Sequence, residues 1–330
     1  MPERTTVTQV VQVAAETTEG TAVAANKKLP SVTISPALKT NIDAFRPLGN
    51  KFQTIHAQGK EWSAAAVSMQ PTYSELEYLM ASALAYAAPV QQAATTAYKW
   101  TATPSGIAED TIKSLTVERG SSVQAEKIAG AICTDLTISG DRDSIEVSGT
   151  MLGRLMSTGI SLTGSPTSIE QIPILPKEVS VYLDTSSGGI GGTKLSRVLS
   201  WSVQVGNRRG PLWVVDSAQT SYVASVELPV EGKLKLKVEG DATGMGLTTP
   251  LRDGTFRYVR IAAISGQNAG TAIPYSLTMD HAVQMSDEPT PLDDADGVYA
   301  TEYTFDITFD SAWSGGQALT WALINKQTGL

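Results

Sequence analysis

The two histidines, His56 and His281, are the first residues to test for acid–base chemistry, because the pKa of histidine lies closest to neutral pH. His281 falls on the apolar side of an alternating segment, where a core or interface role is far commoner than that of a general base. No serine, histidine and aspartate set stands out. The sequence therefore predicts no catalytic residues, with a cryptic carboxylate pair as the open alternative.

The acidic segment SDEPTPLDDADG, residues 286–297, could attract a cation, because it carries five carboxylates. It fails the calcium-loop template, since Leu292 occupies the first ligand position and Tyr303 the twelfth. We expect a solvated hairpin tip, with no metal site and no cofactor. The carboxylates are those of Asp287, Glu288, Asp293, Asp294 and Asp296.

The glycine-rich run SSGGIGGTK, residues 186–194, lacks the Gly-Lys-Ser/Thr order of a phosphate-binding loop, because Gly192 is followed by Thr193 and Lys194. It predicts a flexible turn. The basic clusters KLKLKVEG and GNRRGP have no interleaved aromatic residues, which argues against nucleic-acid binding. Lys233, Lys235 and Lys237 share one strand face and could meet carboxylates of a neighbouring subunit.

Composition limits the class of protein. Only 18% of the 330 residues are charged, a low share that suggests a surface covered by other protein. The formal charge is −8, and the second half holds most of it: residues 1–177 have 14 basic and 16 acidic residues, residues 178–330 have 11 and 17. Cys133, the one cysteine, excludes an intrachain disulfide and is expected to be a small buried apolar residue. With no apolar leader or membrane-length run, we expect folding in a cytoplasm and no membrane partner.

Alternation of apolar and polar residues is the strongest local signal and predicts a mainly β fold. It recurs at residues 114–118, 135–151, 233–238, 277–285 and 303–310. One helix is predicted between Pro71 and Pro89, where Thr72 and Glu75 have capping-box spacing and Leu76, Leu79, Met80, Ala83 and Leu84 fall on one face. Such strands suit antiparallel sheets arranged as a sandwich or a barrel.

The order of these segments repeats, which indicates a duplication. Residues 31–49 correspond to 198–215, residues 112–120 to 258–266, and the hairpin at 136–152 to that at 277–310. The segment WSAAAVSM corresponds to LKLKVEG, and the helix has only the Gly-rich DATGMGLTTPLRDGT opposite it. We expect an arm at 1–30, too polar for a core, then a domain at 31–157, a connector at 158–177, a second domain at 178–311 and a C-terminal tail at 312–330.

Three stretches carry a resemblance to a known family. They are the opening VQVAAETTEGTAVAANKKLP, the helix YSELEYLMASAL after a Trp-Ser strand, and LTVERG leading to IAGAICTDLTISGDRDSIEVSGTML. Together they resemble the tail tube proteins of long-tailed, non-contractile bacteriophages. The resemblance spans most of the chain, and the missing second helix departs from the family plan.

The resemblance implies two tandem tail-tube-like β-barrel or β-sandwich domains, the first with one flanking helix, in rings that stack into a hollow tube. Copies of the chain would be the main partners, with other tail proteins at the tube ends and DNA passing without specific binding. Since family rings present six domains, a two-domain chain predicts a trimer, with a hexamer as the alternative. The virion tail is the expected location.

Two alternatives of other kinds remain. One is a different β-rich virion component, such as a baseplate ring protein. The other is a surface-displayed β-sandwich that binds glycans or cells, for which Trp201, Trp213, Trp313 and Trp321 could supply an exposed aromatic platform.

Overall fold

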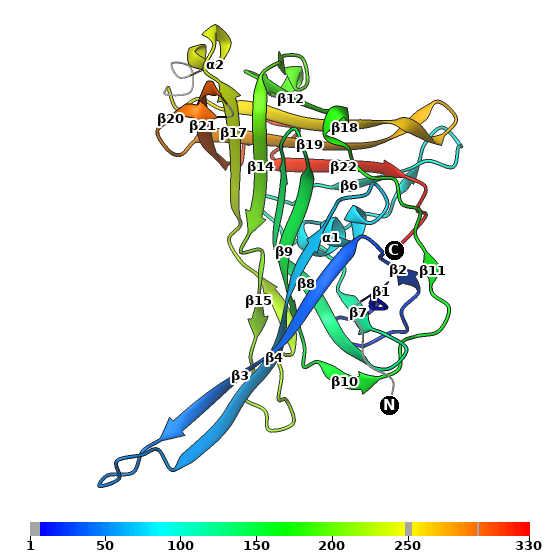
Figure 1. Ribbon diagram of the computed structural model, residues 1–330, viewed down its shortest axis with the longest axis vertical. Helices are drawn as coiled ribbons and strands as arrows, with labels where there is room; N and C mark the ends of the chain where they lie inside the picture. Colours follow the sequence, from blue (N-terminus) through cyan, green and yellow to red (C-terminus); the bar gives the residue numbers. More distant parts are fainter. Residues whose placement is uncertain (1–6, 248–252, 296) are drawn as a thin grey trace.

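The computed structural model describes residues 7–247, 253–295 and 297–330. The prediction of a mainly β protein is confirmed, since 53% of the chain is strand and 5% is helical. Figure 1 shows β8, β9, β14 and β17 along the long axis, with β18, β19, β22 and β6 running across them. The main hydrophobic core draws on both groups of strands, so one core serves both.

The N-terminal elements run from Val10 to Ser168. The strands are β1 (Val10–Ala15), β2 (Lys27–Lys28), β3 (Val32–Phe45), β4 (Ile55–Met69), β5 (Val90–Gln91), β6 (Tyr98–Ala102), β7 (Leu115–Gly120), β8 (Ala125–Gly140), β9 (Ile145–Gly153), β10 (Ser157–Ile160) and β11 (Thr167–Ser168), with helix α1 (Leu76–Ala83) between β4 and β5.

The C-terminal elements run from Pro176 to Asn325. The strands are β12 (Val179–Asp184), β13 (Lys194–Leu195), β14 (Val198–Gly206), β15 (Arg209–Leu212), β16 (Ala224–Glu227), β17 (Glu231–Glu239), β18 (Arg257–Gly270), β19 (Ile273–Met285), β20 (Thr290–Ala295), β21 (Val298–Ile307) and β22 (Leu319–Asn325). The helical segments are α2 (Ala242–Gly246) and two 3₁₀ turns at Pro176–Glu178 and Ser187–Gly189.

Two sets of strands have the same pairing pattern. In the first set, β7 pairs with β1 and β8, β8 with β9 and β10, and β4 with β9 and β3. In the second set, β18 pairs with β12 and β19, β19 with β21 and β22, and β17 with β21 and β14. Every pairing of one set thus has a counterpart in the other, and all of them are antiparallel.

The sets are joined edge to edge where β14 pairs with β8. A second link runs through β22, which pairs with β19 of its own set and with β6. Within the described residues, the strand pairings do not return on themselves, and no closed barrel is found. The architecture is therefore an open arrangement of crossed sheets rather than two closed barrels.

Helix α1 lies between the sheets and packs against β8 and β6. The predicted Thr72–Glu75 interaction forms, since the Glu75 amide donates to Thr72 Oγ1 at 3.1 Å and that hydroxyl donates to the Glu75 carboxylate at 2.8 Å. The prediction of a single buried face is wrong, because every residue of α1 is buried. Even Glu77 is enclosed, and burial raises its pKa well above the usual range.

Two segments at the chain ends differ from expectation. Residues 1–30 were predicted too polar for a core, yet Val11 and Val13 of β1 are buried and β1 pairs along β7; residues 1–6 lie outside the described part. The segment 312–330 was predicted to be a tail, yet β22 is a central strand with Trp321 and Leu323 buried. Both predictions failed because polar residues in these segments are satisfied by buried partners distant in sequence, such as Asn325, which accepts from the Trp100 indole at 3.0 Å.

Burial follows the predicted alternation in β8, β9 and β17 but not in β7, β19 and β21, where Asp280, Ala282 and Thr304 are also buried. Residues 135–151 and 233–238 keep one buried face and one exposed or partly exposed face. In β7, Thr116 and Glu118 are buried as well. Thr116 donates to Glu16 at 2.8 Å, and Glu118 pairs with Lys127 at 3.0 Å, so the polar face of β7 is covered by other parts of the chain.

Candidate assembly surface

The β3–β4 hairpin has a long exposed end. It projects beyond the rest of the molecule at the end opposite the crossing strands (Figure 1), and residues 41–60 are all exposed. A soluble monomer seldom exposes so many apolar side chains together, so the hairpin is a candidate contact surface. These side chains are Leu38, Ile42, Phe45, Leu48, Phe52 and Ile55.

The contact between β14 and β8 shows how the edge of one strand set is covered by the other set. We call this pairing of residues 201–205 with 136–140 the internal junction. Val203 and Val205 lie opposite Ile138 and Leu136, and all four side chains are fully buried. The junction therefore combines a backbone ladder with an apolar inner face.

Arg208, just beyond the junction, uses its whole guanidinium group to bind residues of both the N-terminal and the C-terminal half of the chain. It donates to the carbonyl oxygens of Ala83 and Leu84 at the end of α1, at 3.1 and 2.7 Å, and to Asp110 Oδ2 at 2.7 Å. Its third nitrogen lies 3.1 Å from Glu227 Oε1. Because Arg208 is only 1% exposed, this buried ion pair holds β14 and β15 in place.

The ribbon formed by β15 and β16 is fastened by residues of the first set. Ser225 donates through its amide and its hydroxyl to the Glu19 carboxylate, at 2.8 and 3.0 Å. Arg154 donates to the carbonyl oxygen of Val223, and Tyr222 Oη donates to that of Gly130 at 3.1 Å. The β16 side of this ribbon is therefore bound to the N-terminal half of the chain, although residues 214–220 at its tip are exposed.

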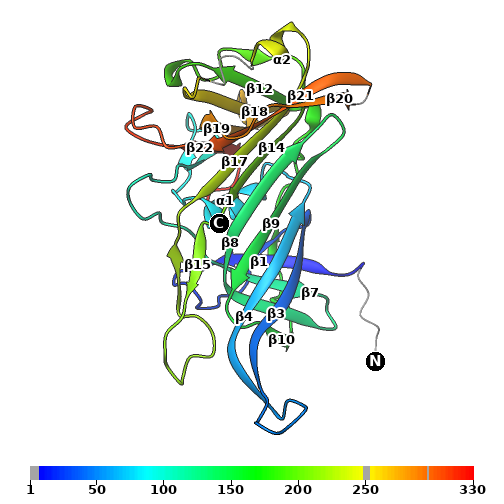
Figure 2. The same ribbon diagram turned by 90° about the vertical axis from the view of Figure 1, so that its left-hand side faces the viewer.

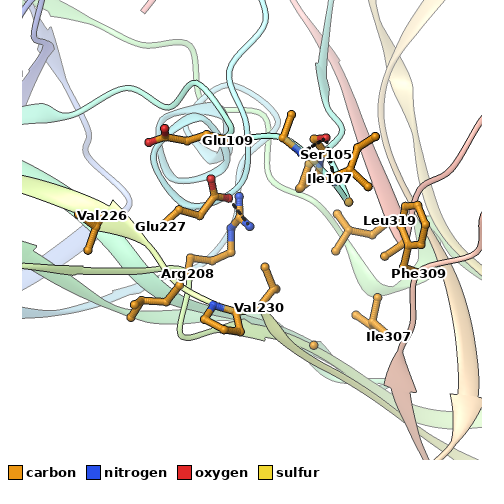
Figure 3. A pocket seen from close by; sticks show the side chains of 17 residues that line it. Ser105, Ile107, Glu109, Arg208, Val226, Glu227, Val230, Ile307, Phe309 and Leu319 are labelled. Atoms are coloured by element: carbon orange, nitrogen blue, oxygen red, sulfur yellow. Dashed lines mark hydrogen bonds and ion pairs between the residues drawn. The ribbon is translucent and has the colours of Figure 1, made fainter.

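A cavity of about 730 Å³ lies beside Arg208 (Figure 3). Glu227 and Arg208 face each other on one wall, and Ile307, Phe309 and Leu319 form the apolar opposite wall. The charged groups on this wall already bind one another, so they present no free acid or base to a substrate.

A second cavity, of about 620 Å³, lies beside β20, and we call it the β20 cavity. Met245, Met285 and Tyr299 contribute its apolar lining, and Asp287 and Glu288 contribute carboxylates. Of the other acidic residues predicted here, Asp296 lies outside the described residues, and β20 pairs with β21 around Leu292. Tyr303 is buried in the core. Among the described residues, no cluster of side chains could hold a metal ion.

The two histidines lie in different parts of the structure and form no common site. His56 is exposed on the β3–β4 hairpin. His281 is fully buried and accepts a hydrogen bond at Nε2 from the Trp321 indole at 2.9 Å. Burial lowers the pKa of His281 to about 3, so this imidazole is neutral at neutral pH. The prediction that His281 is a core residue is confirmed.

The glycine-rich run is a turn whose amides bind a carboxylate of the same chain. Gly191 and Thr193 each donate a backbone N–H to Asp184 at 2.8 Å. Those donors are the ones a phosphate would need, so Asp184 takes the place of an external anion.

The basic clusters are paired within the chain. The Nζ atoms of Lys233 and Lys235 lie 3.9 and 3.5 Å from carboxylate oxygens of Asp306 and Glu302 on the neighbouring β21. These two lysines therefore form ion pairs within the chain. Arg208 and Arg209 of GNRRGP are buried. The sequence identified this basic cluster but did not predict that Arg208 binds Asp110, which lies 98 residues earlier.

The cysteine and the tryptophans are mostly interior. Cys133 is buried as predicted, and burial raises the pKa of its thiol to about 12. Trp201, Trp313 and Trp321 are buried, and Trp213 packs against Trp62 and Tyr222. These four tryptophans therefore form no exposed aromatic platform.

Comparison with protein-family models finds no match, and comparison with curated proteins finds none. In the described part of the chain, no helix is both long enough and apolar enough to cross a membrane.

Proposed function

We propose that this chain is a structural virion protein that assembles into stacked rings, forming the hollow tail tube of a long-tailed, non-contractile bacteriophage. In this proposal the two strand sets are two diverged copies of one tube unit. The observation that carries it is the pairing pattern found twice in one chain, with one copy joined edge to edge to the other. A unit that joins its own duplicate by a strand edge has the geometry for joining further copies.

The proposed ring contains three chains and has pseudo-sixfold symmetry, with six chains as the alternative. Fusing two units turns half of the contacts around a ring into contacts within chains, which lowers the entropy lost on assembly. Surface loops would join successive rings, and other tail proteins would bind the tube ends. The protein would be made in the host bacterial cytoplasm and reside in the virion tail.

The proposed role requires no catalysis and no cofactor. DNA would pass through the channel without specific binding, because a net acidic channel wall repels phosphates. The formal charge of −8 supports this expectation. A channel lined mainly by lysine and arginine would contradict it.

Electron microscopy of the purified protein tests the proposal. Tubes or stacked rings are expected as protein concentration rises. Closed single rings that never stack would favour a baseplate or other ring component instead. A protein that stays monomeric at every concentration would contradict both assemblies, and the buried tryptophans already disfavour the glycan-binding alternative.

A further inference from the structure

The internal junction is a template for a contact that the isolated chain leaves open. β8 has β14 along the edge of residues 136–140. In the repeated pairing pattern, β3 of the first set corresponds to β14 of the second set. Residues 136–140 of β8 correspond to β20, since that part of β8 pairs with β9 and β20 pairs with β21. Among the described residues, no strand pairs with the outer edge of β3 or of β20.

The register of the two open strands follows from their buried neighbours. We align Ala65 of β4 with Leu234 of β17, because both are buried and each lies opposite a residue of β9 or β21 that also pairs with β8 or β19. Ala65 and Leu234 lie opposite Pro36 and Val203. Ala37 therefore corresponds to Gln204, and Leu38 to Val205. Val205 is 0% exposed, whereas Leu38 is 50% exposed, so an apolar position that the internal junction buries is open on β3.

The partner residues on β20 follow in the same way. In the first set, Ser148 of β9 pairs with Ser68 of β4 on one side and with Thr137 of β8 on the other. In the second set, Glu302 of β21 pairs with Lys237 of β17 on one side and with Thr290 of β20 on the other. Thr290 is thus the counterpart of Thr137. Because Gln204 lies opposite Thr137 in the internal junction, Ala37 of one copy should lie opposite Thr290 of another.

We propose that the β20 edge and the β20 cavity form a docking surface for the β3–β4 hairpin of a second copy of this chain. This inference rests on the proposed ring assembly and names the surfaces that meet in it. Just beyond the internal junction, the Arg208 amide donates to the carbonyl oxygen of Thr134 on β8. The corresponding region beside β20 is the open cavity lined by Met285 and Met245.

Side-chain chemistry supports this match. The stretch of the first hairpin that corresponds to the Arg208 region carries Ile42 and Phe45, which are exposed and apolar, as Met245, Met285 and Tyr299 of the cavity require. Charge is complementary as well, since the cavity carries Asp287 and Glu288. Residues 36–60 hold one acidic residue, Asp43, and four basic residues: Lys39, Arg46, Lys51 and Lys60.

Two prolines limit how the edges meet. The register places Pro36 opposite Pro291, and neither has an N–H to donate. The contact should therefore rely on the apolar hairpin side chains and on charge more than on an unbroken ladder. The same prolines would discourage nonspecific edge pairing.

Disulfide trapping tests the docking surface, since directly opposed residues of antiparallel strands lie within disulfide reach. The double variant Ala37→Cys with Thr290→Cys replaces two exposed residues, while the native Cys133 stays buried. A matched control pairs Ala37→Cys with Gln267→Cys, an exposed site on β18. Mild oxidation should cross-link the first variant between chains at least tenfold more than the control.

Products are read on a denaturing gel and particles by electron microscopy. A ladder of linked chains ending at the ring size supports the docking surface. Rings or tubes without specific cross-links would overturn the docking surface and leave the proposed function standing. Neither particles nor cross-links would overturn both.

Discussion

The two long hairpins of this chain share a position in the pairing pattern but differ in what surrounds them. The β14–β17 hairpin and its β15–β16 extension are bound by β8, Glu19, Arg154 and the Arg208 ion pairs. The β3–β4 hairpin pairs with β9 on one side only, and its residues 41 to 60 are exposed. The β14–β17 hairpin thus stabilises the folded chain, and the β3–β4 hairpin is available to contact other chains.

The difference predicts where a substitution will act. Changes at the internal junction should lower the free energy of unfolding of the single chain. Changes on the open hairpin should leave that free energy nearly constant and weaken association. The predictions below are ordered by their expected effect on unfolding.

Replacing Arg208 should have the largest effect. Arg208→Met leaves the buried Asp110 without its cation, and such losses cost about 3–5 kcal/mol. Urea unfolding measures this, with Arg46→Met on the open hairpin as the matched control, expected to change stability by less than about 0.5 kcal/mol. Equal effects of the two substitutions would mean that the hairpins do not differ as described.

Gly140 should tolerate no side chain at the internal junction. A Cβ there would lie 2.9 Å from the ring of Trp201, so Gly140→Ala should destabilise the chain by about 1–3 kcal/mol through overpacking. Gly164→Ala is the control, because no atom lies within 4 Å of its added Cβ. Thermal melts of both variants check this, and an unchanged midpoint for Gly140→Ala would count against close packing of β14 on β8.

Mild acid should weaken the crossing strands through His281. The unfolded pKa is 6.5 and the folded pKa is about 3, so the folded chain keeps the imidazole neutral while the unfolded chain gains a proton below pH 6.5. Its stabilising contribution is complete above pH 6.5 and should fall by about 1.4 kcal/mol at pH 5.5.

His281→Gln, which keeps an acceptor for Trp321, should remove this part of the pH dependence. Unfolding of both proteins between pH 7.5 and 5.5 makes the comparison. Parallel curves would show that His281 does not titrate between the folded and unfolded states.

The open hairpin should affect assembly and little else. Ile42→Ser combined with Phe45→Ser removes exposed side chains, so unfolding should change by less than about 0.5 kcal/mol per site. Sedimentation should nevertheless show a shift from assembled particles to single chains. Val90→Ser, an exposed apolar site on β5, should leave assembly intact.

Calcium should have the smallest effect. The acidic segment lacks the ligand spacing of a calcium loop, so millimolar Ca²⁺ should leave the thermal midpoint nearly unchanged relative to a chelator control. A rise of many degrees would identify a cation site beside β20 and would require a different account of the β20 cavity.

Local pattern predicted much of this fold. The period of two at residues 233–238 placed Leu234, Leu236 and Val238 on the buried face, as observed. The spacing of Thr72 and Glu75 predicted their hydrogen bonds beside α1. These features depend on neighbours in sequence, which periodicity and capping rules describe well.

Long-range contacts could not be predicted in the same way. Thr116 and Glu118 read as a solvated face, and only the packing of β1 and other segments against β7 buries them. Arg208 binds Asp110 across 98 residues, and β22 joins β19 and β6 although residues 312–330 read as a tail. Polar residues buried by remote partners carry no local signature.

The symmetry of an assembled particle tests the central claim most directly. Reconstruction of a tube or ring by electron cryomicroscopy should give three chains per ring, with β3 of each chain beside β20 of the next and the two strand sets alternating around the channel. Six chains per ring, or a ring in which the β3–β4 hairpin contacts no neighbour, would contradict the account.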